Sequence, residues 1–354
     1  MSEQFSGTTA VHERQRFDEP ALQQWFVDRV DPSAARRFAV TQFKGGQSNP
    51  TFLVETPDAR YVVRRKPAGM LLPSAHAVER EFRVMQALAA TDVPVPRVHA
   101  LCEDASVIGS SFYAMDFVDG RILWDPTLPD ATTAERGAIC DEMNRVLAAL
   151  HGVDPAAIGL GDYGRPGNYL QRQVDRWSRQ YRASETERID AMEQLMAWLP
   201  ANLPPQQGTS IVHGDYRLDN LVFAHGEPRI VAVLDWELST LGDPLADFAY
   251  HCMAWHLSPP FRGLAHLSPS RMAELNLPSE RAYVDAYSRR RSVPEVPPEQ
   301  WRAYMAFNLF RAAAIAQGIM GRALAGNASN AHALDAGRQA RTLAEIGWAQ
   351  IEAR

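Results

Sequence analysis

One short segment, IVHGDYRLDNLVF at residues 211–223, combines residue types that could act together on a phosphate ester. An apolar run ends in His213-Gly214-Asp215, and four residues separate Asp215 from Asn220. Phosphoryl transfer needs a carboxylate that accepts a proton from the attacking hydroxyl, and it needs an oxygen ligand for Mg²⁺ nearby. The spacing predicts that Asp215 and Asn220 fill these two roles, with His213 as a further catalytic candidate.

A second carboxylate, Asp235, ends the apolar run of IVAVLDWE at residues 230–237. A hairpin of strands 221–223 and 230–234 would bring Asn220 and Asp235 to one edge. Kinases place an H-x-D loop, an Asn five positions after its Asp, and a later metal-binding Asp in this order. A lone Asp after a strand is usually a turn former, but two matched pieces favour a magnesium site.

Three weaker patterns lie upstream, and each has an ordinary structural alternative. The glycine-rich run KGGQSN at 44–49 could approach phosphates or could be a plain hairpin turn. A cation that pairs the nucleotide phosphates could come from Arg64, Arg65 or Lys66, and strand alternation puts the two arginines on opposite faces. Glu81 could pair with that cation or could be solvated. Five pieces therefore follow the order found in kinases: the glycine-rich run, the cationic strand, the helix Glu, the H-x-D segment and the metal-binding Asp.

Apolar periodicity predicts how these pieces are positioned. In the first part of the chain it predicts helices at 20–30 and 76–90 and strands at 38–43, 51–56, 61–65, 107–108 and 111–117. Farther along it predicts helices at 133–150, 168–182 and 189–199, strands at 210–212, 221–223 and 230–234, and a mostly helical remainder. The expected fold class is α+β and bilobal, with an N-terminal antiparallel sheet, one main helix in that lobe, and a larger helical C-terminal lobe.

Composition excludes several classes of protein. The 354 residues carry 36 basic and 42 acidic side chains, a net charge of −6, whereas non-specific nucleic-acid binders usually show a basic surplus. No apolar run approaches the roughly 20 residues of a membrane span. The segment MSEQFSGTTAVHERQRF lacks the apolar core of a secretory signal. Three cysteines without a C-x-x-C pair suit a reducing compartment. We therefore expect a cytoplasmic protein without nucleic-acid or membrane partners.

The signature HGDYRLDN with a downstream LDWE resembles the aminoglycoside phosphotransferase/choline kinase family, whose fold is protein-kinase-like, over roughly residues 35–330. Four segments resemble one branch more closely, the kinase-like domains joined or adjacent to acyl-CoA dehydrogenases: FKGGQSNPTFLV, LLPSAHAVEREFRVM, LDWELSTLGDPLADFAYH and RAAAIAQGIMGRA. The resemblance implies ATP- and Mg²⁺-dependent phosphorylation of a small-molecule hydroxyl. In that branch the implied acceptor is a hydroxyacyl-CoA, notably of the 4-hydroxyacyl type, with a functional link to an acyl-CoA dehydrogenase.

The same resemblance implies roles for individual positions. Asp215 is the catalytic carboxylate, and Asn220 and Asp235 are the Mg²⁺ ligands. The loop over the phosphates comprises Gly45, Gly46, Ser48 and Asn49. Arg64 takes the place of the nucleotide-binding lysine, Glu81 that of its helix partner, and the hinge that meets adenine contains Met115, Asp116 and Val118. Asp243 and Asp247 are expected to brace the catalytic loop or cap a helix. The expected domains are an arm and short helix at 1–34, a nucleotide-binding lobe at 35–117, and a catalytic and substrate-binding lobe at 118–354.

The molecule that accepts the phosphoryl group is the part of the reaction that the sequence defines least. Residues 168–182, NYLQRQVDRWSRQYR, are basic and aromatic, which suits an acyl chain on anionic CoA better than a polycationic aminoglycoside. The candidate substrate residues are Trp124, Arg172, Trp177, Glu237 and Arg311, although each could instead serve the core or a salt bridge. An aminoglycoside or amino-alcohol kinase and a nucleotide binder without turnover stay open as alternatives. The oligomeric state also stays open, with a homodimer among the options.

Overall fold

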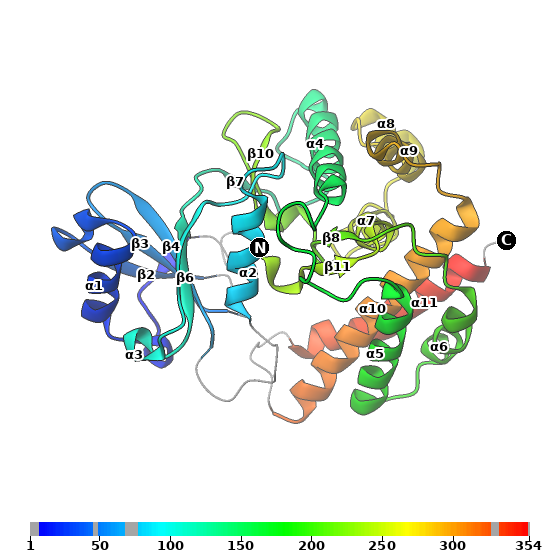
Figure 1. Cartoon of the computed structure of the whole chain (residues 1–354). Coiled ribbons are helices and arrows are strands. Elements are labelled where there is room, and N and C mark those ends of the chain that lie inside the picture. Colours follow the sequence, from blue (N-terminus) through cyan, green and yellow to red (C-terminus); the bar gives the residue numbers. More distant parts are fainter. Residues whose placement is uncertain (1–6, 45–48, 68–76, 327–332, 353–354) are drawn as a thin grey trace. The chain divides into compact units, whose positions relative to one another are not determined.

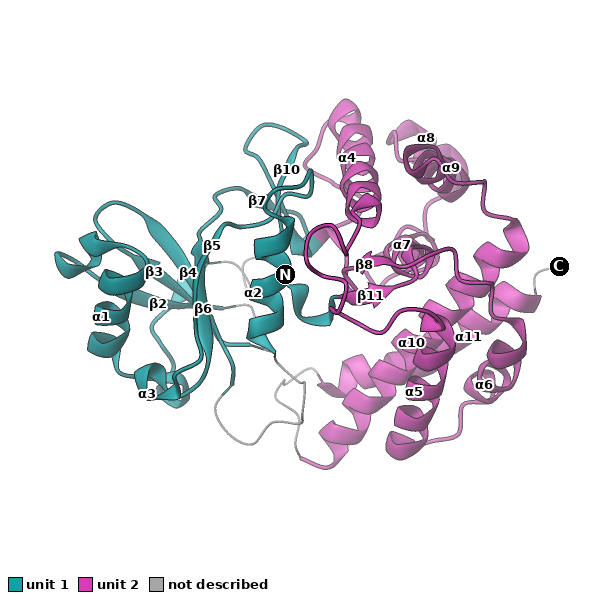
Figure 2. Cartoon of the chain, in the orientation of Figure 1, with its two compact units in different colours: residues 1–124, 219–239 teal, residues 125–218, 240–354 magenta. Residues whose placement is uncertain are grey.

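The computed structural model describes residues 7–44, 49–67, 77–326 and 333–352. The chain divides into two compact units, which Figure 2 colours separately. Unit 1 contains residues 1–124 and 219–239, and unit 2 contains residues 125–218 and 240–354. The segment that carries Asn220 and Asp235 therefore belongs to unit 1, while Asp215 belongs to unit 2. The predicted domain boundaries stay a prediction.

Unit 1 is built on a six-stranded antiparallel sheet (Figure 1). Its strands run in the order β1, β2, β3, β4, β6, β5. Their bounds are β1 Thr8–Thr9, β2 Ala39–Phe43, β3 Thr51–Glu55, β4 Arg60–Arg65, β5 Val98–Cys102 and β6 Phe112–Asp116. In β4, Val62 pairs with Met115 and Arg64 pairs with Tyr113, which fixes the register with β6. The predicted antiparallel sheet is confirmed.

Two helices cover opposite faces of this sheet. Helix α1 (Glu19–Arg29) buries Leu22 and Phe26 against Phe52 and Val63 in one core, at about 1.5–3 kcal/mol per fully buried side chain. Helix α2 (Val78–Leu88) packs on β5 and β6, where Phe82 meets the ring of Tyr113. Because neighbouring side chains of a strand alternate, Arg64 and Tyr113 face α2 while Val63 faces α1. The sheet thereby presents Arg64 to Glu81 of α2.

A second, three-stranded sheet in unit 1 joins β7 (Arg121–Ile122), β9 (Leu221–Phe223) and β10 (Ile230–Val233). Strands β9 and β10 form the predicted hairpin, with Leu221 opposite Val233. A short 3-10 helix, η3 (Leu218–Asn220), precedes β9, and another, η4 (Trp236–Leu238), follows β10. The hairpin therefore carries Asn220 and Asp235 at adjoining ends.

Unit 2 is mostly helical and is organised around one long buried helix, α10 (Pro298–Leu324), which packs on α5, α6, α7 and α11 (Figure 1). The remaining helices are α4 (Thr133–Gly152), α5 (Tyr169–Ser184), α6 (Asp190–Asn202), α7 (Pro244–Cys252), α8 (Pro269–Glu274), α9 (Glu280–Arg291) and α11 (Ala333–Glu352). A two-stranded ribbon of β8 (Ser210–Val212) and β11 (Thr240–Gly242) leads into the HGD segment and into α7. This ribbon positions the HGD segment, residues 213–215, beside α7.

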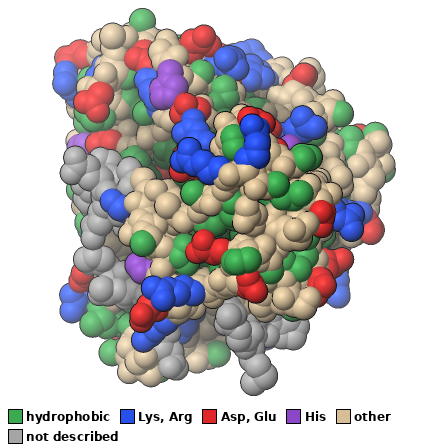
Figure 3. Space-filling model, turned by 90° about the vertical axis from the view of Figure 1, so that its left-hand side faces the viewer, with side chains coloured by type: hydrophobic (Ala, Val, Ile, Leu, Met, Phe, Trp, Pro, Cys, Tyr) green, Lys and Arg blue, Asp and Glu red, His purple; other side chains and the backbone are tan. Residues whose placement is uncertain are grey.

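The residues described by the structure contain no helix long and apolar enough to cross a membrane. On the face drawn in Figure 3, basic and acidic side chains lie interspersed among apolar ones. That mixture agrees with the small net charge of the sequence.

One predicted strand is wrong. Residues 107–108 belong to a short helix, α3 (Ala105–Ile108), because Asp104 accepts a hydrogen bond from the Ser106 N–H and Gly109, at φ +89°, ends the turn. The β-branched pair Val107-Ile108 favoured a strand, but these two end signals decide the local structure. Strands β1, β5, β7 and β11 are additions that the sequence analysis missed.

Candidate active site

In unit 1, a single guanidinium joins three carboxylates. Arg64 Nε lies 2.9 Å from Glu81 Oε2, and Arg64 Nη2 lies 2.5 Å from Asp235 Oδ1 and 3.5 Å from Glu237 Oε2. The sequence left open whether Arg64, Arg65 or Lys66 is the cation that pairs the nucleotide phosphates, and the contacts of the three side chains differ. Arg65 points to the other face and donates to the carbonyl of Ile108, and Lys66 pairs with Glu79. Arg64 is the cation that contacts Glu81 and the metal-ligand candidate Asp235.

Glu81 is almost fully buried, with 1% of its surface exposed. The amide of Asn49 donates to its Oε1 at 2.9 Å, and the hydroxyl of Tyr113 donates to Oε2 at 3.2 Å. Burial raises the pKa of Glu81, Arg64 lowers it, and the charges of Asp235 and Glu237 raise it again, to about 7. The three carboxylates and one guanidinium have a formal charge of −2 when all are ionised, which suits a divalent cation.

The backbone around Asp235 is held in an unusual conformation. Asp235 has a φ of +64°, in the left-handed region that non-glycine residues rarely adopt. The Leu234 N–H donates to the Asn220 carbonyl at 2.8 Å, and the buried ring of Trp236 donates to the Val233 carbonyl at 2.9 Å. These bonds tie the carboxylate segment to the hairpin and offset the strain. Such strain often accompanies functional positions.

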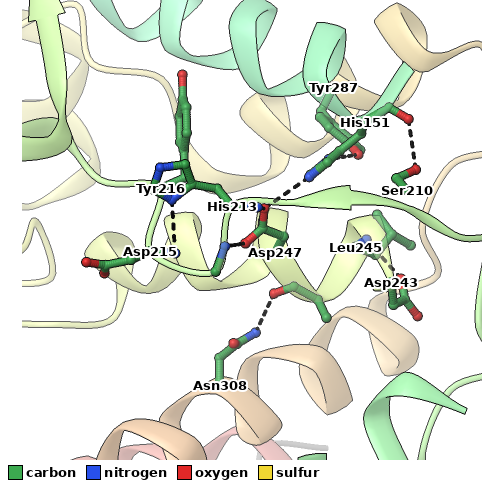
Figure 4. Close-up of polar contacts among 12 residues, drawn as sticks. His151, Ser210, His213, Asp215, Tyr216, Asp243, Leu245, Asp247, Tyr287 and Asn308 are labelled. Carbon is green, nitrogen blue, oxygen red and sulfur yellow. Dashed lines mark hydrogen bonds and ion pairs between the residues drawn. The ribbon is translucent and has the colours of Figure 1, made fainter. Parts of the chain in front are cut away.

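In unit 2, the carboxylate of Asp247 in α7 accepts hydrogen bonds from the backbone of the HGD segment (Figure 4). Its Oδ2 accepts the His213 N–H at 2.7 Å, and its Oδ1 accepts the Gly214 N–H at 2.8 Å. Gly214 has a φ of +84°, which glycine adopts without steric cost, and this turn leads directly into Asp215. The predicted bracing role of Asp247 is thus observed.

A buried hydrogen-bond chain holds Asp247 in turn (Figure 4). His151 Nε2 donates to Asp247 Oδ2 at 3.2 Å, and His151 Nδ1 accepts from the Tyr287 hydroxyl at 2.6 Å. Burial alone would raise the pKa of Asp247, but the hydrogen bonds from His151 and the His213 N–H outweigh burial and lower the pKa. Burial lowers the pKa of His151, which favours a neutral ring. Asp243, also predicted to be structural, caps α7 by accepting from the Leu245 N–H.

His213 takes a supporting position that differs from the predicted catalytic one. Its side chain is completely buried, and its Nδ1 accepts the Asp215 N–H at 3.2 Å (Figure 4). The ring stabilises the turn that presents Asp215. A fully buried ring of this kind is suited to positioning the loop.

The catalytic candidate Asp215 has a close partner that the sequence analysis missed. The Tyr250 hydroxyl donates to Asp215 Oδ1 at 2.5 Å, and Arg217 Nε lies 3.2 Å from the same oxygen. Tyr250 follows Asp247 by three residues on α7, so both side chains lie on one helix face. That spacing in the segment GDPLADFAY was the available signal. One helix face therefore holds both the loop backbone and its carboxylate.

The predicted hinge lies at the end of β6. The N–H groups of Asp116 and Phe117 donate to the Arg97 and Arg60 carbonyls, while Met115 is buried in the strand. In the part of the chain that the structure describes, the N–H of Val118 has no hydrogen-bond partner and is the first such group after the strand. Gly45, Gly46 and Ser48 of the predicted phosphate loop lie outside the described residues.

The five candidate substrate residues lie in different surroundings. Glu237 belongs to the Arg64 cluster, and Trp124 is the last residue of the first segment of unit 1. Arg172 donates to the carbonyls of Arg165 and Gly167, and the Trp177 ring donates to Gln173 within α5. Arg311 is buried and donates to the Gly214 carbonyl at 2.8 Å. Arg311 is the candidate substrate residue that contacts the catalytic loop.

The donor set of unit 1 fits Mg²⁺. The described residues contain no group of three or more His, Cys, Asp or Glu side chains that could enclose a metal ion. Mg²⁺ usually takes one or two protein oxygens and completes its shell with water and phosphate oxygens. Asn220 and Asp235, beside a surplus of negative charge, provide ligands of that kind.

Comparison with known proteins identifies the family. A family model described as the phosphotransferase enzyme family matches residues 39–292. The chain belongs to this family. The crystal structure of a thermostable mutant of aminoglycoside phosphotransferase APH(4)-Ia, in a ternary complex with ADP and hygromycin B, has a TM-score of 0.61 at 17% identity. The match covers 94% of this chain and 98% of that chain. This likeness confirms the predicted bilobal α+β, kinase-like fold.

Two relatives are much more similar in sequence. A solved structure from Ralstonia eutropha JMP134, named for the aminoglycoside phosphotransferases, is 56% identical, has a TM-score of 0.86, and covers 95% of this chain and 99% of that chain. Acyl-CoA dehydrogenase family member 10 of Mus musculus is 45% identical over 341 residues, which are 96% of this phosphotransferase-family chain. The chain spans only 32% of the length of that relative. The match confirms the predicted resemblance to kinase-like domains associated with acyl-CoA dehydrogenases.

Proposed function

We propose that this phosphotransferase-family protein transfers the γ-phosphoryl group of ATP to the hydroxyl of a hydroxyacyl-CoA, of the 4-hydroxyacyl type. The observation that carries the chemistry is the catalytic loop, in which Asp247 fixes the backbone and Tyr250 and Arg217 fix the Asp215 carboxylate. A carboxylate held in one orientation can align an attacking hydroxyl and accept its proton.

The reaction follows from these groups. Asp215 accepts the proton of the acceptor hydroxyl, whose oxygen forms a bond to the γ-phosphorus of ATP. The bond between that phosphorus and the β–γ bridging oxygen breaks, and ADP leaves. Asn220 and Asp235 would hold Mg²⁺, which, when bound, neutralises charge on the phosphates. Arg64 offers phosphate oxygens a fork of N–H donors, and the Val118 N–H can donate a hydrogen bond to the adenine ring.

The choice of acceptor rests on different support. A relative named as an acyl-CoA dehydrogenase family member contains a segment 45% identical to this chain. Arg311, a cation, contacts the catalytic loop through the Gly214 carbonyl, whereas a polycationic aminoglycoside would favour acidic surroundings. Both points favour an acyl thioester, and a functional link to an acyl-CoA dehydrogenase is part of this proposal. A cytoplasmic location and a homodimer stay predictions.

The experiment is an acceptor panel. ADP release would be measured with MgATP and a 4-hydroxyacyl-CoA, choline or kanamycin, and mass spectrometry would identify the phosphorylated product. We expect turnover with the thioester, and its loss in the Asp215→Asn variant. Turnover with choline or kanamycin alone would replace the acyl-CoA proposal with an amino-alcohol or antibiotic kinase. No turnover with any acceptor would favour a nucleotide binder without transfer activity.

A further inference from the structure

Arg311 of α10 is a buried guanidinium linked to the catalytic loop in two ways. Its Nη2 donates to the Gly214 carbonyl at 2.8 Å, directly before Asp215 in the chain. Its Cζ lies 5.1 Å from the centre of the Tyr250 ring, and the hydroxyl of that ring donates to Asp215 Oδ1 at 2.5 Å. The Tyr250 side chain therefore contacts both the guanidinium of Arg311 and the carboxylate of Asp215, the catalytic candidate.

Comparison with two other buried arginines shows what Arg311 lacks. Arg64, 9% exposed, is paired with three carboxylates. Arg65, 3% exposed, donates to three oxygens: the Ile108 carbonyl at 3.1 Å, and the Gln15 carbonyl and side-chain oxygen at 3.2 and 2.8 Å.

Arg311 is 7% exposed, yet within the described chain it donates to one oxygen and forms no ion pair with a carboxylate. Its Nε is buried without a hydrogen-bond partner among the described residues, as is the Nε of Arg65, so the difference between these two lies in the number of oxygens that each guanidinium contacts. A guanidinium has five N–H donors, and a buried charge is costly unless it is paired or well hydrogen-bonded. Of the three arginines, Arg311 has the greatest unmet capacity to bind oxygen.

We propose that Arg311 binds the acyl carbonyl oxygen of the acceptor while Asp215 binds the hydroxyl that is phosphorylated. This inference rests on the proposed function and specifies which group of the acceptor is recognised. A 4-hydroxyacyl thioester carries its carbonyl three carbon–carbon bonds from the carbon that bears the hydroxyl. A carbonyl oxygen accepts hydrogen bonds from a guanidinium, whereas an ammonium group at the same place would be repelled. Arg311 thereby selects acyl compounds over amines.

Two analogues that differ in one oxygen test this contact without requiring turnover. Pentanoyl-CoA has the carbonyl, and S-pentyl-CoA, its thioether, lacks it. Isothermal titration would measure both dissociation constants for the full chain and for the variants Arg311→Lys and Arg65→Lys. Lysine keeps the charge but loses the guanidinium fork. Arg65→Lys is the matched control, because Arg65 is also buried but donates to three oxygens of the protein, whereas Arg311 donates to one.

The wild-type chain is expected to bind the thioester about 10- to 100-fold more tightly than the thioether, the range for a hydrogen bond to a charged group. Arg311→Lys should abolish that preference, and Arg65→Lys should keep it. Equal binding of both analogues by the wild type, no binding of either, or a preference that survives Arg311→Lys would overturn the inference. If the preference is present but the acceptor panel shows no phosphate transfer, the proposed function fails while the carbonyl contact stands.

Discussion

Glu81 in unit 1 and Asp247 in unit 2 are both buried carboxylates, with 1% and 4% of their surfaces exposed. Their pKa values nevertheless shift in opposite directions. Burial, together with Asp235 and Glu237, raises the pKa of Glu81 to about 7 despite its contact with Arg64. Burial opposes ionisation of Asp247 as well, but the donors from His151 and the His213 N–H outweigh it and lower the pKa.

The two pKa values differ in direction because the two carboxylates have different shares of the hydrogen-bond donors around them. Arg64 serves three carboxylates, so the unit 1 cluster keeps a surplus of negative charge that a bound cation would relieve. Asp247 alone receives two backbone N–H groups and a histidine ring. The first arrangement is suited to bind a charged ligand, and the second is suited to hold a loop still. Buried charge is therefore arranged to suit cation binding in one unit and rigidity in the other.

The largest effect on stability is expected from Asp247→Ala. This substitution leaves the His213 and Gly214 N–H groups and the His151 ring without their acceptor. Removing one partner from such a buried network should lower the free energy of unfolding by about 3–5 kcal/mol. Urea denaturation at pH 7 would measure the change. The control is Asp175→Ala, at an exposed position of α5, which should change stability by less than about 0.5 kcal/mol. Similar values for the two variants would contradict the bracing role.

A smaller, pH-dependent effect is expected from Glu81→Gln. Because the fold raises the pKa of Glu81 from an ordinary value of 4.5 to about 7, the stabilising contribution of its protonated form is complete below pH 4.5. That contribution is lost as the pH rises through 7. The free energy of unfolding of the wild type, relative to the variant, should therefore fall by up to about 3 kcal/mol across this window. A relative stability that is constant or rises would show that Arg64 alone decides the ionisation of Glu81.

The smallest effect is expected from Tyr250→Phe. Loss of one hydrogen bond to Asp215 should lower kcat about tenfold and leave the KM for ATP unchanged. The matched control is Tyr283→Phe, which removes a buried hydroxyl that is bonded to His251 and not to Asp215. In an Asp215→Asn background, Tyr250→Phe should cause no additional loss. An additional loss there would mean that Tyr250 acts independently of Asp215.

The parts that could be predicted from the sequence depend on local order. The hairpin that carries Asn220 and Asp235 follows from two short apolar runs and a turn between them, and strand alternation places Arg64 and Arg65 on opposite faces. Such patterns depend on neighbours in the chain. The meeting of Arg64 with Glu81 was expected from the resemblance to the family, not from these local patterns.

Contacts between distant elements could not be predicted in the same way. Tyr250 reaches Asp215 because α7 packs beside the β8–β11 ribbon, and Arg311 reaches Gly214 from a helix that begins more than eighty residues later. Helical periodicity shows that Arg311 lies in an apolar helix, but not which loop lies against it. The mistaken strand at 107–108 shows the converse, since capping by Asp104 outweighed the β-branched pair.

The most direct test of the proposed phosphoryl transfer is the turnover of Asp215→Asn, measured as ADP release at saturating MgATP and acceptor beside its affinity for ADP. Asparagine keeps the shape of the side chain but cannot accept the proton of the hydroxyl. We predict that kcat falls by about 10²- to 10⁴-fold, the usual contribution of a general base, while the Kd for ADP stays within about twofold of the wild type. Turnover close to the wild-type value would contradict the assignment of Asp215 and the mechanism built on it.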